Sequence, residues 1–196
     1  MKSLSLMIFY FLLAPIIHSQ NIFMGLGASL LLPSSEINTG AGFYVSAESE
    51  LLEQFLIRGY SSFLLSEFSA NNQELKTDQY YQTQIEITGI YKPISWNIEP
   101  YVGVGLGYYN PENQQSGNAN VINGFPVGIK DIKSGVGTNI LIGLDLSPKS
   151  KVNFIVEFKR TFFKTNYTYV LNTNEFMENI NLSSNTVSLV VRFGIF

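Results

Sequence analysis

The feature that most constrains the fold of this chain is an alternation of apolar with polar or small residues, which recurs in eight segments after residue 20. In one of them Val102, Val104 and Leu106 alternate with glycines. A period of two residues is typical of a β-strand whose two faces meet different surroundings, whereas a helix would show a period of 3.6. The pattern therefore predicts an all-β protein. The expected strands are 22–32, 40–49, 54–66, 79–91, 98–109, 134–146, 151–163 and 185–196.

The connections between these segments alternate in length after the first hairpin. The short ones are 50–53, 92–97 and 147–150, and the long ones, rich in Asn, Ser, Gly and Gln, are 67–78, 110–133 and 164–184. An even number of strands with short turns at one end and long loops at the other is typical of outer-membrane barrels. Strands of about ten residues suit a tilted crossing of the hydrocarbon layer. We predict an eight-stranded antiparallel up-and-down transmembrane β-barrel with both termini at the short-turn end.

The composition indicates which face of each strand meets lipid. Only 14% of the residues are charged, against about 25% in a usual soluble domain, while 45% are hydrophobic. A soluble lipocalin-like barrel is the structural alternative, but it would keep its apolar faces inside and carry many charges outside. Here the apolar faces carry almost no charge, so we expect them to form an outer wall against lipid.

The opposite faces should fill the lumen, because eight strands enclose a space only wide enough for side chains. Their charges should pair there, since an unpaired buried charge is costly. We also expect their glycines to leave room for Tyr44, Tyr60 and Tyr101 from across the lumen. The result would be a plugged barrel that gives no large-pore conductance and holds neither cofactor nor metal. The predicted polar network of the lumen consists of Glu48, Arg58, Glu86, Glu99, Asp145, Glu157, Lys159 and Arg192.

Aromatic residues near the ends of the expected strands predict the girdles that mark the two membrane interfaces. Ordinary strand aromatics at loop junctions are the alternative explanation. The residues concerned are Tyr80, Tyr81, Tyr91, Trp96, Tyr108, Tyr109, Phe162 and Phe163.

The first twenty residues predict a cleaved secretory signal peptide. Lys2 precedes an apolar run at 4–14 that ends at Pro15, which is too short to span a membrane as a helix. Cleavage after Ser19 would leave a barrel domain at 20–196, with 1–19 as the signal. The exported chain would have 11 basic and 15 acidic residues, a net charge of −4, and would lack both Cys and His because the single histidine is His18. This argues against nucleic-acid binding, thiol chemistry and catalysis by a histidine base.

Three stretches carry a resemblance to a known family: 99–109 (EPYVGVGLGYY), the glycine-containing strand at 135–145, and 190–196 (VVRFGIF). Through them the chain resembles the small outer-membrane β-barrel family that includes the OmpA and OmpX types, especially Bacteroidetes-type members. The resemblance covers essentially the whole exported chain as a pattern of alternation and glycine placement. It implies residence in the bacterial outer membrane and insertion by the outer-membrane assembly machinery, which recognises a last strand ending in an aromatic residue.

The last residue, Phe196, is aromatic as this assembly signal requires, but it is not on the lipid-facing parity of the strand. Phe196 shares its parity with the polar position Arg192, whereas the apolar parity ends at Phe193 and Ile195. Either a bulge or fraying near Gly194 restores the register, or Phe193 and Ile195 carry the recognition. The predicted assembly residues are therefore Phe193, Ile195 and Phe196.

We expect a non-catalytic, monomeric barrel in contact with outer-membrane lipid and lipopolysaccharide. Its long loops at 110–133 and 164–184 would contact host, cell or envelope surfaces, because binding commonly resides in loops held on a rigid scaffold. A narrow transport or small-ligand barrel is the first alternative. A lipid-modifying enzyme is the second, and it is disfavoured because the carboxylates Glu48, Glu86 and Glu157 are better explained as structural.

Overall fold

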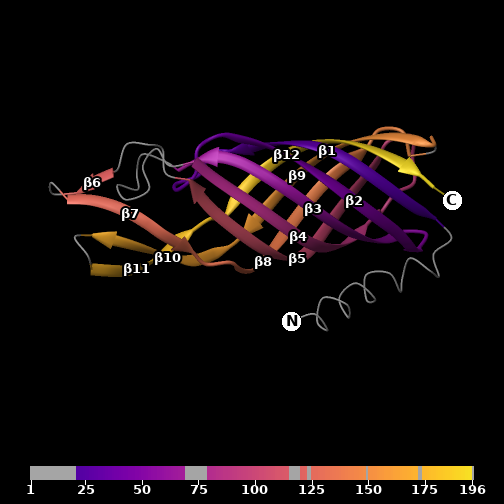
Figure 1. Ribbon diagram of the computed structural model, residues 1–196. Helices are drawn as coiled ribbons and strands as arrows, with labels where there is room; N and C mark the ends of the chain where they lie inside the picture. Colours follow the sequence, from indigo (N-terminus) through magenta and orange to yellow (C-terminus); the bar gives the residue numbers. More distant parts are fainter. Residues whose placement is uncertain are drawn as a thin grey trace.

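Alternating residues place one side of each strand on the outside of a closed barrel and the other side in its lumen. The structure is a computed structural model, which describes residues 21–68, 79–114, 120–122, 125–148, 150–171 and 174–195. Within these residues eight strands close an antiparallel barrel in the order β1-β12-β9-β8-β5-β4-β3-β2 (Figure 1). Their bounds are β1 (Ile22–Leu32), β2 (Gly40–Leu52), β3 (Phe55–Glu67), β4 (Gln79–Tyr91), β5 (Glu99–Gln114), β8 (Gly135–Asp145), β9 (Val152–Phe162) and β12 (Ser184–Gly194).

The eight-stranded barrel and the face assignment predicted from the sequence are confirmed. Outward positions on β1, β2, β5 and β8 carry large exposed apolar side chains, for example Leu26, Phe43 and Val104, each about half exposed or more. The apolar wall is continuous because the register keeps outward residues opposite outward residues, as where Leu26 pairs with Val191 across the closing pair β1 and β12. No helix in the described part of the chain is long and apolar enough to cross a membrane.

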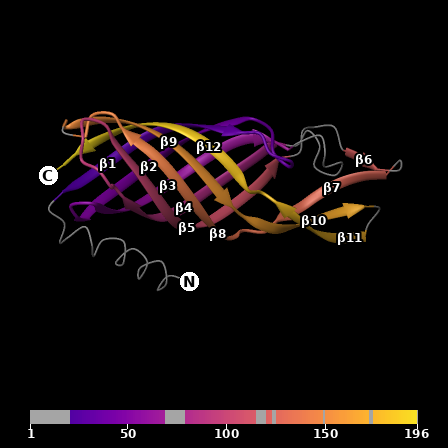
Figure 2. The same cartoon turned by 180° about the vertical axis from the view of Figure 1, so that it is seen from behind.

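The two longest predicted loops are largely β-structure, so predicting them as loops was wrong. Strand β5 continues to Gln114, and the segments beyond it form a second sheet in the order β11-β10-β7-β6. Figures 1 and 2 show this sheet extending past one end of the barrel, opposite the end where β12 finishes. The second sheet consists of β6 (Asn120–Ile122), β7 (Phe125–Ile132), β10 (Lys164–Leu171) and β11 (Asn174–Asn181).

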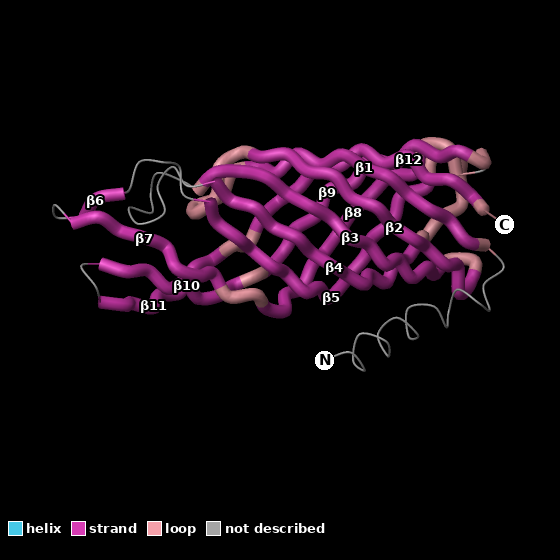
Figure 3. Tube along the Cα trace, viewed as in Figure 1, coloured by secondary structure: helices cyan, strands magenta, loops and turns pink. Residues whose placement is uncertain are grey.

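Three strands of the second sheet, β7, β10 and β11, continue barrel strands with a break of only one or two residues (Figure 3). Phe163 separates β9 from β10, and Leu182 and Ser183 separate β11 from β12. Pairing carries across the break, because the Lys133 amide donates to the Asn166 carbonyl at 2.9 Å. The sheet is therefore held by the rigid barrel rather than by a flexible linker.

The aromatic girdle is only partly as predicted. Tyr91, Trp96, Tyr108 and Phe162 are exposed, and Tyr81 is half-buried. Three other members of the predicted girdle point into the lumen instead, because they have the inward parity of their strands. These are Tyr80, Tyr109 and Phe163, all at most 2% exposed.

Candidate functional site

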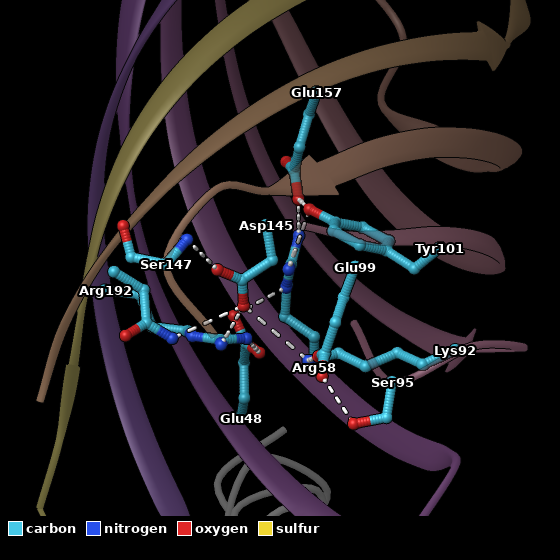
Figure 4. A network of polar contacts seen from close by, with 11 residues as sticks. Glu48, Arg58, Lys92, Ser95, Glu99, Tyr101, Asp145, Ser147, Glu157 and Arg192 are labelled. Atoms are coloured by element: carbon cyan, nitrogen blue, oxygen red, sulfur yellow. Dashed lines mark hydrogen bonds and ion pairs between the residues drawn. The ribbon is translucent and has the colours of Figure 1, made fainter. Parts of the chain in front are cut away.

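The lumen contains a chain of ion pairs that runs from the short-turn end to the middle of the barrel (Figure 4). It begins where Lys92 Nζ lies 3.2 Å from Glu99 Oε2 and 3.7 Å from Asp145 Oδ2. Arg192 continues it by pairing with Asp145. Acidic and basic groups alternate throughout, so each buried charge has a partner of opposite sign.

Two arginines extend the same chain to the barrel centre. Arg192 Nη1 lies 3.2 Å from Glu48 Oε2, and Arg58 Nε lies 3.0 Å from Glu48 Oε1. Arg58 also pairs with Glu157, which accepts a hydrogen bond from Tyr101 and a second, at 3.1 Å, from Tyr44. The seven charged residues of this ion-pair chain, in order, are Glu99, Lys92, Asp145, Arg192, Glu48, Arg58 and Glu157.

A second polar layer lies beside the ion-pair chain, around Glu86. Its carboxylate accepts hydrogen bonds from Tyr60 and Asn139 and pairs with Lys159, whose Nζ is 3.1 Å from Oε1. The Lys159 ammonium also lies 4.3 Å from the centroid of the Tyr60 ring, a cation–π geometry. Tyr60 and Tyr44 connect the two layers, because their ring centroids are 5.6 Å apart.

A cluster of buried apolar and aromatic side chains occupies the other end of the lumen, beneath the second sheet. Phe68 meets Tyr80 edge-on with centroids 5.1 Å apart, and Tyr109 stacks on Phe163 at 5.0 Å. We call this cluster the apolar cap, because it closes the end of the barrel from which the second sheet extends. Its members are Leu31, Ile37, Leu64, Phe68, Tyr80, Tyr109, Ile132, Phe163, Tyr167, Tyr169, Ile180 and Leu182.

The cavities of the described residues show how thoroughly the lumen is filled. The central cavity, bounded by Arg58, Tyr60 and Lys159, has a volume of only about 20 Å³, enough for about one water molecule. A larger cavity of about 330 Å³ lies at the short-turn end and stops at Lys92, Glu99 and Arg192 of the ion-pair chain. Among the residues that the structure describes, no group of three or more His, Cys, Asp or Glu side chains is arranged to hold a metal ion.

All eight residues of the predicted polar network lie in the lumen, each at most 9% exposed. Sequence reasoning missed Lys92, which was assigned to a tight turn although it has the same parity as the inward residues Glu86 and Ile90. Extending the alternation of β4 by one position would have found it.

Glycines leave room for Tyr101 and Tyr44, but these glycines are on the neighbouring strand rather than across the lumen, and the register partners of Tyr60 are Ser46 and Glu86. Gly143 is the register partner of Tyr101 on the neighbouring strand, and a Cβ atom at Gly143 would lie 2.1 Å from the Tyr101 ring. Gly27 has the same relation to Tyr44. Each ring therefore lies flat over a glycine of the adjacent strand, which the sequence cannot show without the register.

The predicted assembly residues lie at the end of β12. Phe193 and Ile195 are exposed on the outer wall, whereas Phe196 lies outside the described residues. Pairing with β1 runs in unbroken register from Leu32↔Asn185 to Phe23↔Gly194, so the bulge considered near Gly194 is not present. The predicted signal peptide at 1–19 also lies outside the described residues.

Comparison of the structure with solved structures decides the class of fold. OprG of Pseudomonas aeruginosa superposes with a TM-score of 0.70 at 10% identity, covering 90% of this chain and 96% of that one. The outer membrane protein AlkL gives 0.64 at 13% identity, covering 90% of each chain. Neisserial surface protein A gives 0.61 at 13% identity, covering 88% of this chain and 96% of that one. The chain has the fold of the small outer-membrane β-barrel proteins.

The small outer-membrane β-barrel resemblance inferred from the sequence pattern is thereby confirmed at the level of the fold. Comparison with protein-family models finds no match, and neither does comparison with curated sequences. At these identities the structural likeness defines the barrel and its topology, and the role of the protein has to be argued from its own residues.

Proposed function

We propose that this protein is a non-catalytic, monomeric outer-membrane barrel that serves as a scaffold, exported with loss of residues 1–19, and that its second sheet contacts other surfaces outside the cell. The observation that carries the proposal is the four-stranded sheet β11-β10-β7-β6, which extends the barrel at the end with the long connections. In outer-membrane barrels that end is extracellular.

The filled lumen supports a scaffold rather than a pore. A solute would have to separate Arg58 from Glu157 and then displace the apolar cap. Both steps oppose passage, because breaking a buried ion pair and opening a packed apolar cluster are costly. The same contacts make the barrel a rigid base for the second sheet.

The second sheet offers side chains suited to contact. On the edge strand β11, Phe176 is 42% exposed and Met177 is 56% exposed. An exposed ion pair joins Lys130 Nζ on β7 to Glu175 Oε1 on β11, across the intervening strand β10, at 2.6 Å. Exposed apolar groups flanked by charge are characteristic of surfaces that bind proteins or cells.

Trimming the β10–β11 hairpin tests the proposal. Tyr167 and Glu178 are register partners, so an Asn-Gly turn in place of residues 168–177 joins them without disturbing the barrel. We expect folded protein at the wild-type level, judged by heat-modifiable gel mobility. We also expect a several-fold loss of adherence of expressing bacteria to epithelial monolayers and of their sedimentation by self-aggregation.

A matched control replaces Trp96, an exposed aromatic residue in a turn at the opposite end, with Ser. Adherence and aggregation that survive trimming, or that fall equally in the Trp96→Ser variant, would refute a role for the sheet.

One observation favours the alternative of a small-ligand barrel, namely the cavity of about 330 Å³ at the short-turn end. Both signs of charge line it, through Glu50, Glu99, Lys92 and Arg192. Uptake of small polar solutes into vesicles containing the purified barrel would support this alternative, and its absence supports the scaffold.

A further inference from the structure

Three basic residues lie on the outward face of the strands near the point where β9 passes into β10. Figure 2 shows that this point is at the rim of the barrel next to the second sheet. Arg160 and Lys164 share the outward parity of exposed Phe162, which lies between them. Lys133 is on the neighbouring strand, beside Asn166, to whose carbonyl its amide donates. We call Lys133, Arg160 and Lys164 the basic rim.

Arg160 is an unusual residue for its position. It lies on the outward face of β9, where Phe154 and Phe158 are exposed on one side of it and Phe162 on the other. A cation on a wall facing hydrocarbon is stable only if its head reaches the polar interface. Its guanidinium lies 5.5 Å from the centroid of the Phe162 ring and donates to Asn185 Oδ1 at 3.0 Å. An exposed aromatic ring at this level is itself typical of the interface.

The cations of the basic rim lack acidic partners among the residues that the structure describes. None of the three is in an ion pair with a described carboxylate, whereas nearby Lys130 is paired with Glu175. The Lys133 ammonium contacts only Met177 Sδ, at 3.9 Å. The described acidic groups on the same surface are Asp131 and Glu175, so the surface keeps an excess of positive charge.

Exposed carboxylates lie elsewhere on the described part of this rim. Strands β3 and β5 carry Glu67 and Glu112 near their outer ends. In the barrel order β5 is two places from β9 and β3 is four places from it. These described acidic groups are therefore on other strands than the basic rim.

The spacing of the basic rim suits a headgroup with more than one phosphate. Arg160 and Lys164 are four residues apart, or about 13 Å along a strand. Lys133 lies on the next strand opposite Asn166, which is two residues beyond Lys164, so it is about 7 Å farther along and about 5 Å to the side. The flexible side chains of Arg160 and Lys164 can converge on anionic groups between them, and charge-assisted contacts to phosphate are among the strongest polar contacts.

We propose that the basic rim binds the phosphate groups of a phosphorylated glycolipid in the outer leaflet, the lipid A part of lipopolysaccharide. The acyl chains lie along the apolar wall below Arg160, and the phosphates lie at the level of Phe162. This inference rests on the proposed function only for the placement of the second sheet outside the cell. It does not depend on adherence, so the two can fail separately.

The test is a titration of the purified barrel in zwitterionic detergent with diphosphorylated lipid A, followed by native mass spectrometry. Each cation near an anionic lipid surface strengthens binding of the lipid. We therefore expect the affinity for lipid A to fall about fivefold for each cation that is removed. Lys164→Gln should therefore weaken binding about fivefold, and Arg160→Gln with Lys164→Gln about 25-fold. Lys164 is exposed, so the single variant gives an answer even if the double variant does not fold.

The matched control is Lys151→Gln, which removes one exposed lysine at the short-turn end and should leave the affinity unchanged. Lipid A without phosphates should bind much more weakly than the phosphorylated form. Equal weakening by Lys151→Gln, or equal affinity for dephosphorylated lipid A, would overturn the site. Equal affinity for phosphatidylglycerol at the same total charge would overturn its assignment to a glycolipid.

Discussion

At the scale of single residues, the stability of this barrel depends on where each charge finds its partner. Arg58 stands between Glu48 and Glu157 and is 3% exposed, so it neutralises two buried carboxylates at once. Lys130 is paired with Glu175 at 2.6 Å, yet both side chains are more than half exposed. Burial rather than the distance between the charged atoms decides the cost of losing an ion-pair partner.

Replacing Arg58 with Met should lower the free energy of unfolding by about 3–5 kcal/mol, because two buried carboxylates lose their cation. The matched variant Lys130→Met should cost about 1 kcal/mol or less. Urea unfolding of the barrel refolded into lipid vesicles measures both. Similar losses for the two variants would show that the ion-pair chain is not what stabilises the lumen.

Two glycines, Gly143 on β8 and Gly89 on β4, should respond oppositely to a methyl group. Gly143→Ala puts a Cβ atom against the Tyr101 ring and disturbs its hydrogen bond to Glu157, at a cost of about 1–3 kcal/mol. Gly89 is exposed and its nearest neighbour would be 4.0 Å away, so Gly89→Ala should raise stability by about 0.5–1 kcal/mol. The same unfolding measurement checks both, and a neutral Gly143→Ala would contradict the packing described for Tyr101.

At the scale of elements, the existence of the barrel strands and their facing could be predicted, but their ends could be predicted only for some strands. The segment 22–32 was predicted with the observed bounds, because its alternation stops where the polar turn begins. Strand β5 extends beyond the predicted 98–109 to Gln114, because pairing with β4 continues through Pro111 and Glu112. The local composition, rich in Asn and Pro, indicated a loop there. The backbone hydrogen bonds between β4 and β5 nevertheless keep these residues in the strand.

The end of β12 carries a prediction about assembly. If outward aromatic groups on the last strand are what the assembly machinery recognises, Phe193→Ser should lower the amount of heat-modifiable protein in outer-membrane fractions several-fold. Phe154→Ser, which removes a similarly exposed outward Phe from β9, should have a smaller effect. Deleting Phe196 tests the remaining candidate. Equal effects of the two Ser variants would point to lost apolar wall rather than to a signal.

At the scale of the whole molecule, the polar layers and the apolar cap divide the lumen between them. The polar network occupies the short-turn half, and the apolar cap seals the half next to the second sheet. Between them the described residues leave a central cavity of only about 20 Å³, although the lumen is lined by charge. This arrangement also explains how an eight-stranded barrel can support a four-stranded sheet beyond its rim.

Purified protein in planar lipid bilayers should therefore give no large, stable single-channel currents. The reason is that the central cavity of about 20 Å³ is closed by contacts that span the barrel. An engineered variant that removes both Arg58 and Glu157 should raise background permeability without producing a wide channel, because the apolar cap remains. Large steady currents from the unaltered protein would contradict the closed lumen.

The sequence by itself determined the barrel, the number of its strands and the inward facing of the eight charged residues, although three inward aromatic residues were predicted as girdle. These follow from alternation, which is a local consequence of placing one face of each strand against lipid and the other in a narrow lumen. The eight charged lumen residues could be named for the same reason. Even Lys92 was within reach of the alternation, had it been extended one position beyond β4.

Only the tertiary structure decided which residues of different strands contact one another. Arg192 meets Glu48 across 144 residues of sequence, and Tyr101 lies over Gly143 because the register of β5 and β8 aligns them. The second sheet and the basic rim likewise depend on contacts between β7 and β10, which are far apart in the chain. Closing the barrel brings these groups together, and no pattern within a single strand contains that information.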